Sequence, residues 1–236
     1  MPTTYPTLSL PAILFAHRGA RAHAPENTLE AFRLAVRLGA TGLESDVWRT
    51  ADGDAVLDHD GVVGTMFRRR RLAEVATADL PGHIPSLAAL YEACGVDHDV
   101  SLDVKDADAI DAVLDAARAA GALGRLWLCH PDLEVLASWR ERSGPARLVH
   151  STRTPAMQRG PEQHAARLRE LGVDAVNLHQ SEWTAGTVAL YHRFGRYCLG
   201  WDAQQPRVIT SLLDMGMDGI FSDHVDRMVD GAAELA

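Results

Sequence analysis

Short apolar runs and longer amphipathic stretches alternate along the whole chain. The apolar runs are rich in β-branched and aromatic residues and are bounded by turn-forming residues, which is typical of strands. They predict eight strands, at residues 13–17, 42–50, 99–105, 125–130, 146–151, 175–179, 196–201 and 219–222. The stretches between them repeat apolar positions with the period of a helix. They predict eight helices, near residues 28–38, 86–94, 107–120, 132–142, 163–171, 185–194, 206–215 and 226–235.

The order of these elements favours a barrel. Eight strand–helix alternations in 236 residues leave about 29 residues for each unit, which suits a βα repeat. No linker rich in Gly, Ser or Pro divides the chain. We therefore predict an α/β protein in which residues 1–236 form a single (β/α)8 TIM-barrel domain. A doubly wound open sheet would produce the same local pattern and is the structural alternative.

Turn-forming residues predict the local geometry near the N-terminus. Asn27 is expected to cap the first helix in a variant of the capping box, and Gly39 is expected to end that helix. Asp52-Gly53 lies between two β-rich runs, which predicts a tight turn and a short hairpin extension after the second strand. This hairpin would return His59 toward the mouth of the predicted barrel.

Composition and charge exclude several classes of partner. The chain carries a net charge of −9, whereas nucleic acids and anionic membranes bind a net basic face. We therefore expect a small-molecule substrate, no nucleic acid and no stable membrane insertion, and the oligomeric state stays open. The apolar segment 8–16 is too short to span a membrane and lacks the basic start of a signal peptide, so we expect a cytoplasmic protein. Three widely spaced cysteines are expected to be reduced core residues: Cys94, Cys129 and Cys198.

Acidic residues occupy one face of two neighbouring predicted strands. Glu44 and Asp46 are separated by one residue, so both point to the same side of a strand, and Asp103 has the matching position on the next strand. Like charges that are buried side by side need a neutralising partner. Oxygen ligation of Mg²⁺ or Ca²⁺ is one solution. The alternative is a salt-bridge network with the basic residues nearby, namely Arg18, Arg49 and Lys105.

Two histidines differ from the other histidines of the chain because each follows a β-rich run at the expected mouth of the barrel. His17 and His59 have side chains whose ordinary pKa lies near neutrality, so they can serve as acid and base in turn on either side of a phosphate. Arg18 offers a bidentate fork that suits phosphate oxygens, and a structural pair with Glu44 is its other interpretation.

Taken in order along the chain, these residues resemble the glycerophosphodiester phosphodiesterase family. The motifs that match are HRG at 17–19, PENT at 25–28, ESD at 44–46, DG at 52–53 and HDG at 59–61. Later matches are IPSL at 84–87, LDVK at 102–105 and GMDGIFSD at 216–223, so the resemblance extends over nearly the whole chain. The resemblance implies a TIM barrel that hydrolyses glycerophosphodiesters with the help of a divalent metal ion.

The resemblance also implies a mechanism and a set of functional residues. The 2-hydroxyl of the glycerol attacks phosphorus, the alcohol leaves with a proton from one histidine, and water opens the cyclic phosphate to give glycerol 3-phosphate. The implied residues are His17 and His59 as the acid–base pair, Glu44, Asp46 and Asp103 as ligands of Mg²⁺ or Ca²⁺, and Arg18, Lys105 and Trp201 as substrate-binding residues.

Several positions depart from the family pattern. Asp103 stands where Glu is usual, and the residues from Trp201 to Gln204 replace a Trp-Thr-Val-Asn segment. Residues 61–83 are too few for a helical insertion that caps the glycerol, so we expect little or no such insertion and a more open mouth. That segment carries Arg68–Arg71 next to Met66 and Phe67, a combination that suits a phosphate with an apolar tail. The alternative is that the arginine run is an inert, solvated face, which is the commoner role of such a run.

Two other functions remain open on the sequence. One is lysophospholipase D or sphingomyelinase-D-like action on a phospholipid with one acyl chain. Apolar lining of the mouth would favour it, and the candidates for that lining are Trp48, Met66, Phe67, Trp183 and Trp201. The other is a barrel that binds phosphodiesters without catalysis. A binding protein needs no acid–base pair, and the presence of His17 and His59 therefore favours an enzyme.

Overall fold

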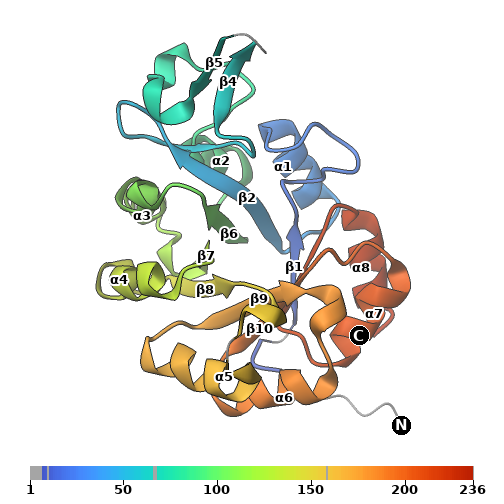
Figure 1. Ribbon diagram of the computed structural model, residues 1–236. Helices are drawn as coiled ribbons and strands as arrows, with labels where there is room; N and C mark the ends of the chain where they lie inside the picture. Colours follow the sequence, from blue (N-terminus) through green and yellow to red (C-terminus); the bar gives the residue numbers. More distant parts are fainter. Residues whose placement is uncertain (1–6, 10, 66–67, 158, 236) are drawn as a thin grey trace.

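The strands form a closed barrel. The computed structural model describes residues 7–9, 11–65, 68–157 and 159–235. Strand β1 pairs with β11 on one side and with β2 on the other, so the parallel sheet closes on itself. This closure confirms the TIM barrel and excludes the doubly wound open sheet (Figure 1). The parallel strands of the described residues are β1 Ile13–Ala16, β2 Gly42–Arg49, β6 Asp99–Val104, β7 Leu126–His130, β8 Arg147–Ser151, β9 Ala175–His179, β10 Tyr197–Trp201 and β11 Gly219–Ser222.

Helices surround the barrel, as Figure 1 shows. Each begins and ends within three residues of the bounds that its apolar period predicts, because the helical stripe is a local property of the sequence. The helices of the described residues are α1 Leu29–Arg37, α2 Leu87–Cys94, α3 Ile110–Ala119, α4 Leu133–Ser143, α5 Gly160–Glu170, α6 Ala185–Arg193, α7 Pro206–Asp214 and α8 Val225–Ala233.

The predicted cap of the first helix was wrong by one residue. Thr28 is the N-cap, and its side chain accepts a hydrogen bond from the backbone N–H of Ala31 at 3.2 Å. Asn27 is buried in the left-handed region with φ 55°, and its Oδ1 accepts a hydrogen bond from Ser45 on β2 at 2.7 Å. The cap rule cannot foresee this role, because Ser45 lies in a different element. Gly39 follows the end of α1 as predicted.

Aromatic side chains fill the interior of the barrel between its two ends. The ring of Phe15 stacks on Phe221 with the centroids 4.6 Å apart and meets Trp127 edge-on at 6.1 Å. Gly42 leaves room for this layer, since a Cβ at that position would lie 2.5 Å from a ring carbon of Phe15. The layer separates a cavity at the carboxyl ends of the strands, lined by Phe221, from a pocket at the amino ends, lined by Trp127.

The chain between β2 and α2 forms two hairpins. Strand β3 (Ala55–Leu57) runs antiparallel to β2 after the Asp52-Gly53 turn, which confirms the predicted hairpin. A second hairpin, β4 (Val62–Thr65) with β5 (Arg68–Arg71), enlarges this extension beyond the prediction (Figure 1). Two 3-10 turns follow it, η1 Leu72–Glu74 and η2 Thr77–Asp79, and among the described residues of this segment no α-helix precedes α2. Met66 and Phe67, which the sequence places in the mouth, lie outside the described residues.

The cysteines and the helices agree with the sequence. Cys129 and Cys198 are buried, Cys94 is half-buried, and all three are free thiols. Burial raises the pKa of the Cys198 thiol well above its ordinary value, which is the behaviour of a core residue and not of a nucleophile.

Among the helices in the described ranges, none has the length and apolar character that a membrane crossing requires.

Candidate active site

A cavity of about 450 Å³ opens at the carboxyl ends of the barrel strands. Seven of the eight site residues that the sequence predicts line it: His17, Arg18, Glu44, Asp46, Asp103, Lys105 and Trp201. These residues come from the ends of several different strands, which is where TIM barrels carry their active sites. Other residues of the lining include Arg21, Ser101, Cys129, Arg153, Asn177, Asp202, Gln204 and Asp223.

The turn after β1 aims Arg18 at the carboxylates. Arg18 has φ 52°, a left-handed conformation that costs a side-chain-bearing residue about 1–3 kcal/mol. Gly19 follows with φ 79°, and a Cβ there would lie 2.7 Å from the carbonyl carbon of Ala31, so only glycine fits. This turn directs the backbone N–H of Arg18 to Glu44 Oε2 at 2.9 Å and brings the Arg18 Nε within 3.2 Å of Asp46 Oδ2.

The register of β2 and β6 sets the carboxylates side by side. Glu44 pairs with Ser101 and Asp46 pairs with Asp103, so the three acidic side chains share the inner face, as predicted. Burial raises the pKa of Glu44, and the charges of Asp46 and Asp103 act in the same direction. The nearby His17 and the Arg18 N–H oppose this increase without cancelling it.

Basic side chains neutralise part of this charge. Lys105 Nζ lies 3.1 Å from Asp46 Oδ1 and also hydrogen-bonds to Asp103. Burial lowers the pKa of Lys105, but the two aspartates more than offset this, and the pKa is raised. The salt-bridge network considered on the sequence is therefore present for Arg18 and Lys105, whereas Arg49 is exposed. Arg18 Nε and Asp46 Oδ2 form an ion pair at 3.2 Å but no hydrogen bond, so the network leaves the hydrogen-bonding capacity of both buried atoms unused.

His17 is oriented by a residue that sequence reasoning missed. Its Nδ1 lies 2.6 Å from Oδ1 of Asp223, at the end of β11, so Nδ1 carries the proton and Nε2 is the nitrogen that remains for a reaction partner. Burial lowers the pKa of His17, but Glu44 and Asp223 outweigh burial, and the net pKa is raised. Asp223 ends the GMDGIFSD motif, which was the available signal. Gln204 holds Asp223 in turn by accepting its backbone N–H at 3.0 Å.

His59 is the one predicted residue outside the lining of this cavity. Its side chain is 44% exposed and its Nδ1 lies 2.9 Å from Asp60 Oδ1. The loop that carries His59 is nevertheless tied to the site, since the backbone N–H of the preceding Asp58 donates to the carbonyl of Asp46 at 3.1 Å. The structure therefore brings His17 together with the carboxylates and leaves His59 exposed and outside the cavity lining.

Trp201, at the end of β10, adds an aromatic side chain to the lining of the cavity. Its ring contacts His179 edge-on, with centroids 4.6 Å apart, and the guanidinium of Arg153 lies over it at 5.6 Å. Two other tryptophans considered for the mouth lie elsewhere. Trp48 donates to the carbonyl of Asp58, and Trp183 is buried and donates to the carbonyl of Leu199.

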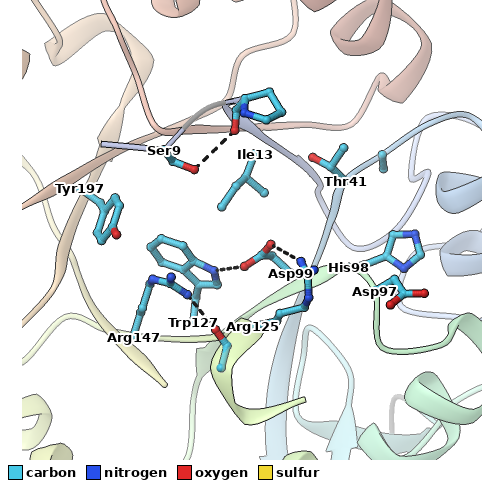
Figure 2. Close-up of a pocket in the computed structure, with 13 residues that line it drawn as sticks. Ser9, Ile13, Thr41, Asp97, His98, Asp99, Arg125, Trp127, Arg147 and Tyr197 are labelled. Atoms are coloured by element: carbon cyan, nitrogen blue, oxygen red, sulfur yellow. Dashed lines mark hydrogen bonds and ion pairs between the residues drawn. The ribbon is translucent and has the colours of Figure 1, made fainter. Parts of the chain in front are cut away.

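A second pocket, of about 530 Å³, lies at the amino ends of the strands. Figure 2 shows the indole of Trp127 between Arg147 and Asp99, which accepts the indole N–H at 2.8 Å. The guanidinium of Arg147 lies over Trp127 at 4.7 Å, and Tyr197 flanks it. Of the described residues that line this pocket, none is a predicted site residue. In TIM barrels this amino-terminal end contributes to the stability of the fold, and the active site lies at the other end.

Comparison with known proteins is consistent with this geometry. The sequence model of the glycerophosphoryl diester phosphodiesterase family matches residues 17–227. A Mycobacterium tuberculosis protein named probable glycerophosphodiester phosphodiesterase 2 is 30% identical over an alignment of 248 positions. The alignment covers 92% of this chain and 89% of that protein.

Solved structures share the fold. The crystal structure of glycerophosphodiester phosphodiesterase from Thermotoga maritima has a TM-score of 0.80 at 23% identity and covers 93% of this chain and 97% of its own. The structure of an Oleispira antarctica phosphodiesterase in complex with the product sn-glycerol-3-phosphate has a TM-score of 0.81 at 20% identity, with coverage of 94% and 96%.

Proposed function

The chain belongs to the glycerophosphoryl diester phosphodiesterase family, whose members are phosphoric diester hydrolases, and we propose that it hydrolyses glycerophosphodiesters to glycerol 3-phosphate and an alcohol. The observation that carries this proposal is the cavity that joins the His17–Asp223 pair with Arg18 and the buried carboxylates. The product complex of the Oleispira antarctica relative supports the same substrate class.

A divalent cation, Mg²⁺ or Ca²⁺, fits the carboxylates, and we assign Glu44, Asp46 and Asp103 as its ligands. All three present oxygen donors, which hard cations prefer. Asp46 Oδ2 is buried and accepts no hydrogen bond, and the Arg18 charge at 3.2 Å compensates it only in part, so it keeps lone pairs that a cation would satisfy. When bound, such a cation stabilises negative charge on the phosphoryl oxygens.

His17 supplies a proton-transfer group at Nε2. Asp223 fixes the tautomer by accepting the Nδ1 proton, so Nε2 can take a proton from an attacking hydroxyl or return one to a leaving alkoxide. In the proposed reaction, the glycerol 2-hydroxyl loses its proton to one histidine and bonds to phosphorus. The bond from phosphorus to the alcohol oxygen breaks, and the second histidine protonates that oxygen. His59 is assigned as this second histidine. Water then opens the cyclic phosphate with the roles reversed.

Arg18 and Lys105 bind the phosphate in this proposal. Arg18 is 12% exposed on its side chain, so its charge acts with little screening by water. Lys105 lines the same cavity as the carboxylates and pairs with Asp46, and an ammonium group at this position can contact a phosphoryl oxygen. Trp201 lines the side of the mouth that would receive the carbon chain of glycerol.

The lining favours a small polar substrate over a lipid. Of its described residues, most are charged or polar, and its large apolar side chains are Trp201 and Phe221. The four arginines of β5 are exposed and do not line this cavity. The His17–Asp223 pair also favours catalysis over simple binding, because a binding site needs no oriented imidazole.

An assay of the purified protein tests the proposal. We expect release of glycerol 3-phosphate from glycerophosphocholine with Mg²⁺ or Ca²⁺ present, and loss of this activity when excess EDTA is added. Glu44→Gln should abolish turnover, whereas Glu141→Gln on the exposed face of α4 should retain it. Full activity in excess chelator would contradict the metal assignment, and inactivity with every metal tested would contradict the proposed reaction.

A further inference from the structure

Two clusters of three metal-ligating side chains lie among the described residues outside the carboxylates of the proposed active site. In each cluster, one donor atom from every residue lies within 4.8 Å of the others. The first cluster, His192, Cys198 and Asp218, is buried and its carboxylate is already engaged. Asp218 accepts hydrogen bonds from Thr7, Leu8, Ser9, His192 and Cys198. The second cluster, His23, His224 and Asp226, is open to solvent.

The second cluster has the geometry of a half-completed coordination shell. His23 Nε2 lies 3.0 Å from Asp226 Oδ1. Tetrahedral Zn²⁺ with bonds of about 2.1 Å holds its ligand atoms roughly 3.4 Å apart, so a small outward shift of these two side chains would admit the ion. The rings of His23 and His224 stand nearly perpendicular, with centroids 6.2 Å apart. The His23 and Asp226 side chains are 37% and 47% exposed, so water can reach the site and complete the shell.

The backbone around the cluster is held before any ligand binds. The N–H of His23 donates to the carbonyl of Ala20 at 2.8 Å, and the N–H of Ala22 donates to the carbonyl of Asp223 at 3.2 Å. His224 N–H donates to Ser222 Oγ at 3.1 Å, and the His224 carbonyl accepts the first helical bond of α8. The loop before α1 and the start of α8 are therefore fixed relative to each other, which lowers the entropic cost of binding.

Charge near the cluster does not oppose a cation. Arg21, the nearest basic residue along the loop, forms ion pairs with Glu26 and Asp223. Arg227, next to Asp226, directs its guanidinium to the carbonyl of Gln204 at 3.2 Å. The charge of Arg21 is thus paired with carboxylates, and Arg227 hydrogen-bonds to a carbonyl outside the cluster.

We propose that His23, His224 and Asp226 bind a late first-row divalent cation such as Zn²⁺. Two imidazoles with one carboxylate are ligands that Zn²⁺, Ni²⁺ and Cu²⁺ prefer over Mg²⁺ and Ca²⁺, which take oxygen ligands. This site is therefore chemically distinct from the carboxylates of the active site. The bound cation cross-links the loop that follows His17 to the helix that follows Asp223, and so stabilises the rim of the cavity.

Zinc titration of the full chain, prepared without a histidine tag and kept in excess Mg²⁺, tests the proposal. Isothermal titration calorimetry should show one Zn²⁺ bound per chain. His23→Ala, His224→Ala and Asp226→Asn should each weaken binding by at least the roughly 10- to 100-fold that loss of an outer-shell partner costs. His83→Ala, which removes an exposed histidine elsewhere, should bind Zn²⁺ as the unaltered protein does. The thermal midpoint should rise with Zn²⁺ in the unaltered protein and in His83→Ala, and should not rise in the three cluster variants.

The Glu44→Gln variant separates this site from the proposed catalytic metal. It should keep the Zn²⁺ equivalent, whether or not the chain proves to be a phosphodiesterase. Loss of that equivalent in Glu44→Gln, or unchanged Zn²⁺ affinity in the three cluster variants, would overturn the proposal. Cobalt(II) provides a second readout that does not depend on calorimetry. Its visible absorption bands should appear with the unaltered protein and be absent in His224→Ala.

Discussion

Acidification should destabilise the protein through a buried chain of hydrogen bonds behind β8. His150 Nε2 lies 3.0 Å from the carbonyl oxygen of Pro131, so this nitrogen carries the proton. His150 Nδ1 then accepts from His164 Nε2 at 2.8 Å, and His164 Nδ1 accepts from the Tyr191 hydroxyl at 2.7 Å. In this series of hydrogen bonds, each N–H or O–H donor has an acceptor only while the imidazole rings of His150 and His164 are both neutral.

The size of the effect follows from the pKa of His164. Burial lowers it from 6.5 to about 4, and the neighbouring His150 acts in the same direction. Between these two values the unfolded chain binds a proton that the folded chain does not, so the free energy of unfolding falls as the pH falls. The whole shift in the pKa of His164 corresponds to a change of about 3 kcal/mol in the free energy of unfolding. Between about pH 7 and pH 5 the loss is about 2 kcal/mol, which corresponds to a fall of about 4–8 °C in Tm.

Denaturant unfolding at a series of pH values, with matched variants, isolates this contribution. His164→Gln should be less stable near pH 7 because it breaks this series of hydrogen bonds. Between about pH 7 and pH 5, its free energy of unfolding should fall by about 2 kcal/mol less than that of the unaltered protein. The exposed His83→Gln should follow the unaltered protein at every pH. The same pH dependence in His164→Gln and the unaltered protein would refute the reasoning. Should His164→Gln fail to fold, histidine NMR decides, because a folded-state titration of His164 near its ordinary pKa of 6.5 would refute it too.

Three further predictions concern the site and the barrel. His17→Ala and His59→Ala should each lower kcat by roughly 10²–10⁴-fold with little change in Tm, and near-native kcat in either variant would remove that histidine from the mechanism. Gly42→Ala should destabilise the fold by about 1–3 kcal/mol, because its Cβ would meet the Phe15 ring. Gly82→Ala should not destabilise it, because a Cβ there meets nothing within 4 Å, and equal melting temperatures of the two variants would contradict this packing. Glycerophosphocholine should be turned over with a higher kcat/KM than monomeric lysophosphatidylcholine, on which the sequence still predicts measurable activity, and complete inactivity on the lysolipid would restrict the substrate to small headgroups.

The local pattern of the sequence predicted the elements and the inner faces of the strands. Glu44 and Asp46 share a face because side chains alternate along a strand, and this holds whatever the strand packs against. The Asp52-Gly53 turn and the end of α1 at Gly39 also depend on nearby residues alone. The hairpin of β4 and β5 was not predicted, because four consecutive arginines have no alternation of apolar and polar positions that would mark a strand.

The contacts that join distant segments were decided only by the tertiary structure. Closure of the barrel through β1 and β2 distinguishes it from an open sheet, and the two folds share the same strand–helix order. The pairing of His17 with Asp223 joins residues 206 positions apart, and the burial of Asn27 against Ser45 overrides its local preference for a helix cap. Residue type and spacing predicted which side chains could perform the chemistry, because those properties act along the chain. Their partners and the pKa shifts of His17 and His164 depend on burial and on charges brought together by folding, which no local pattern specifies.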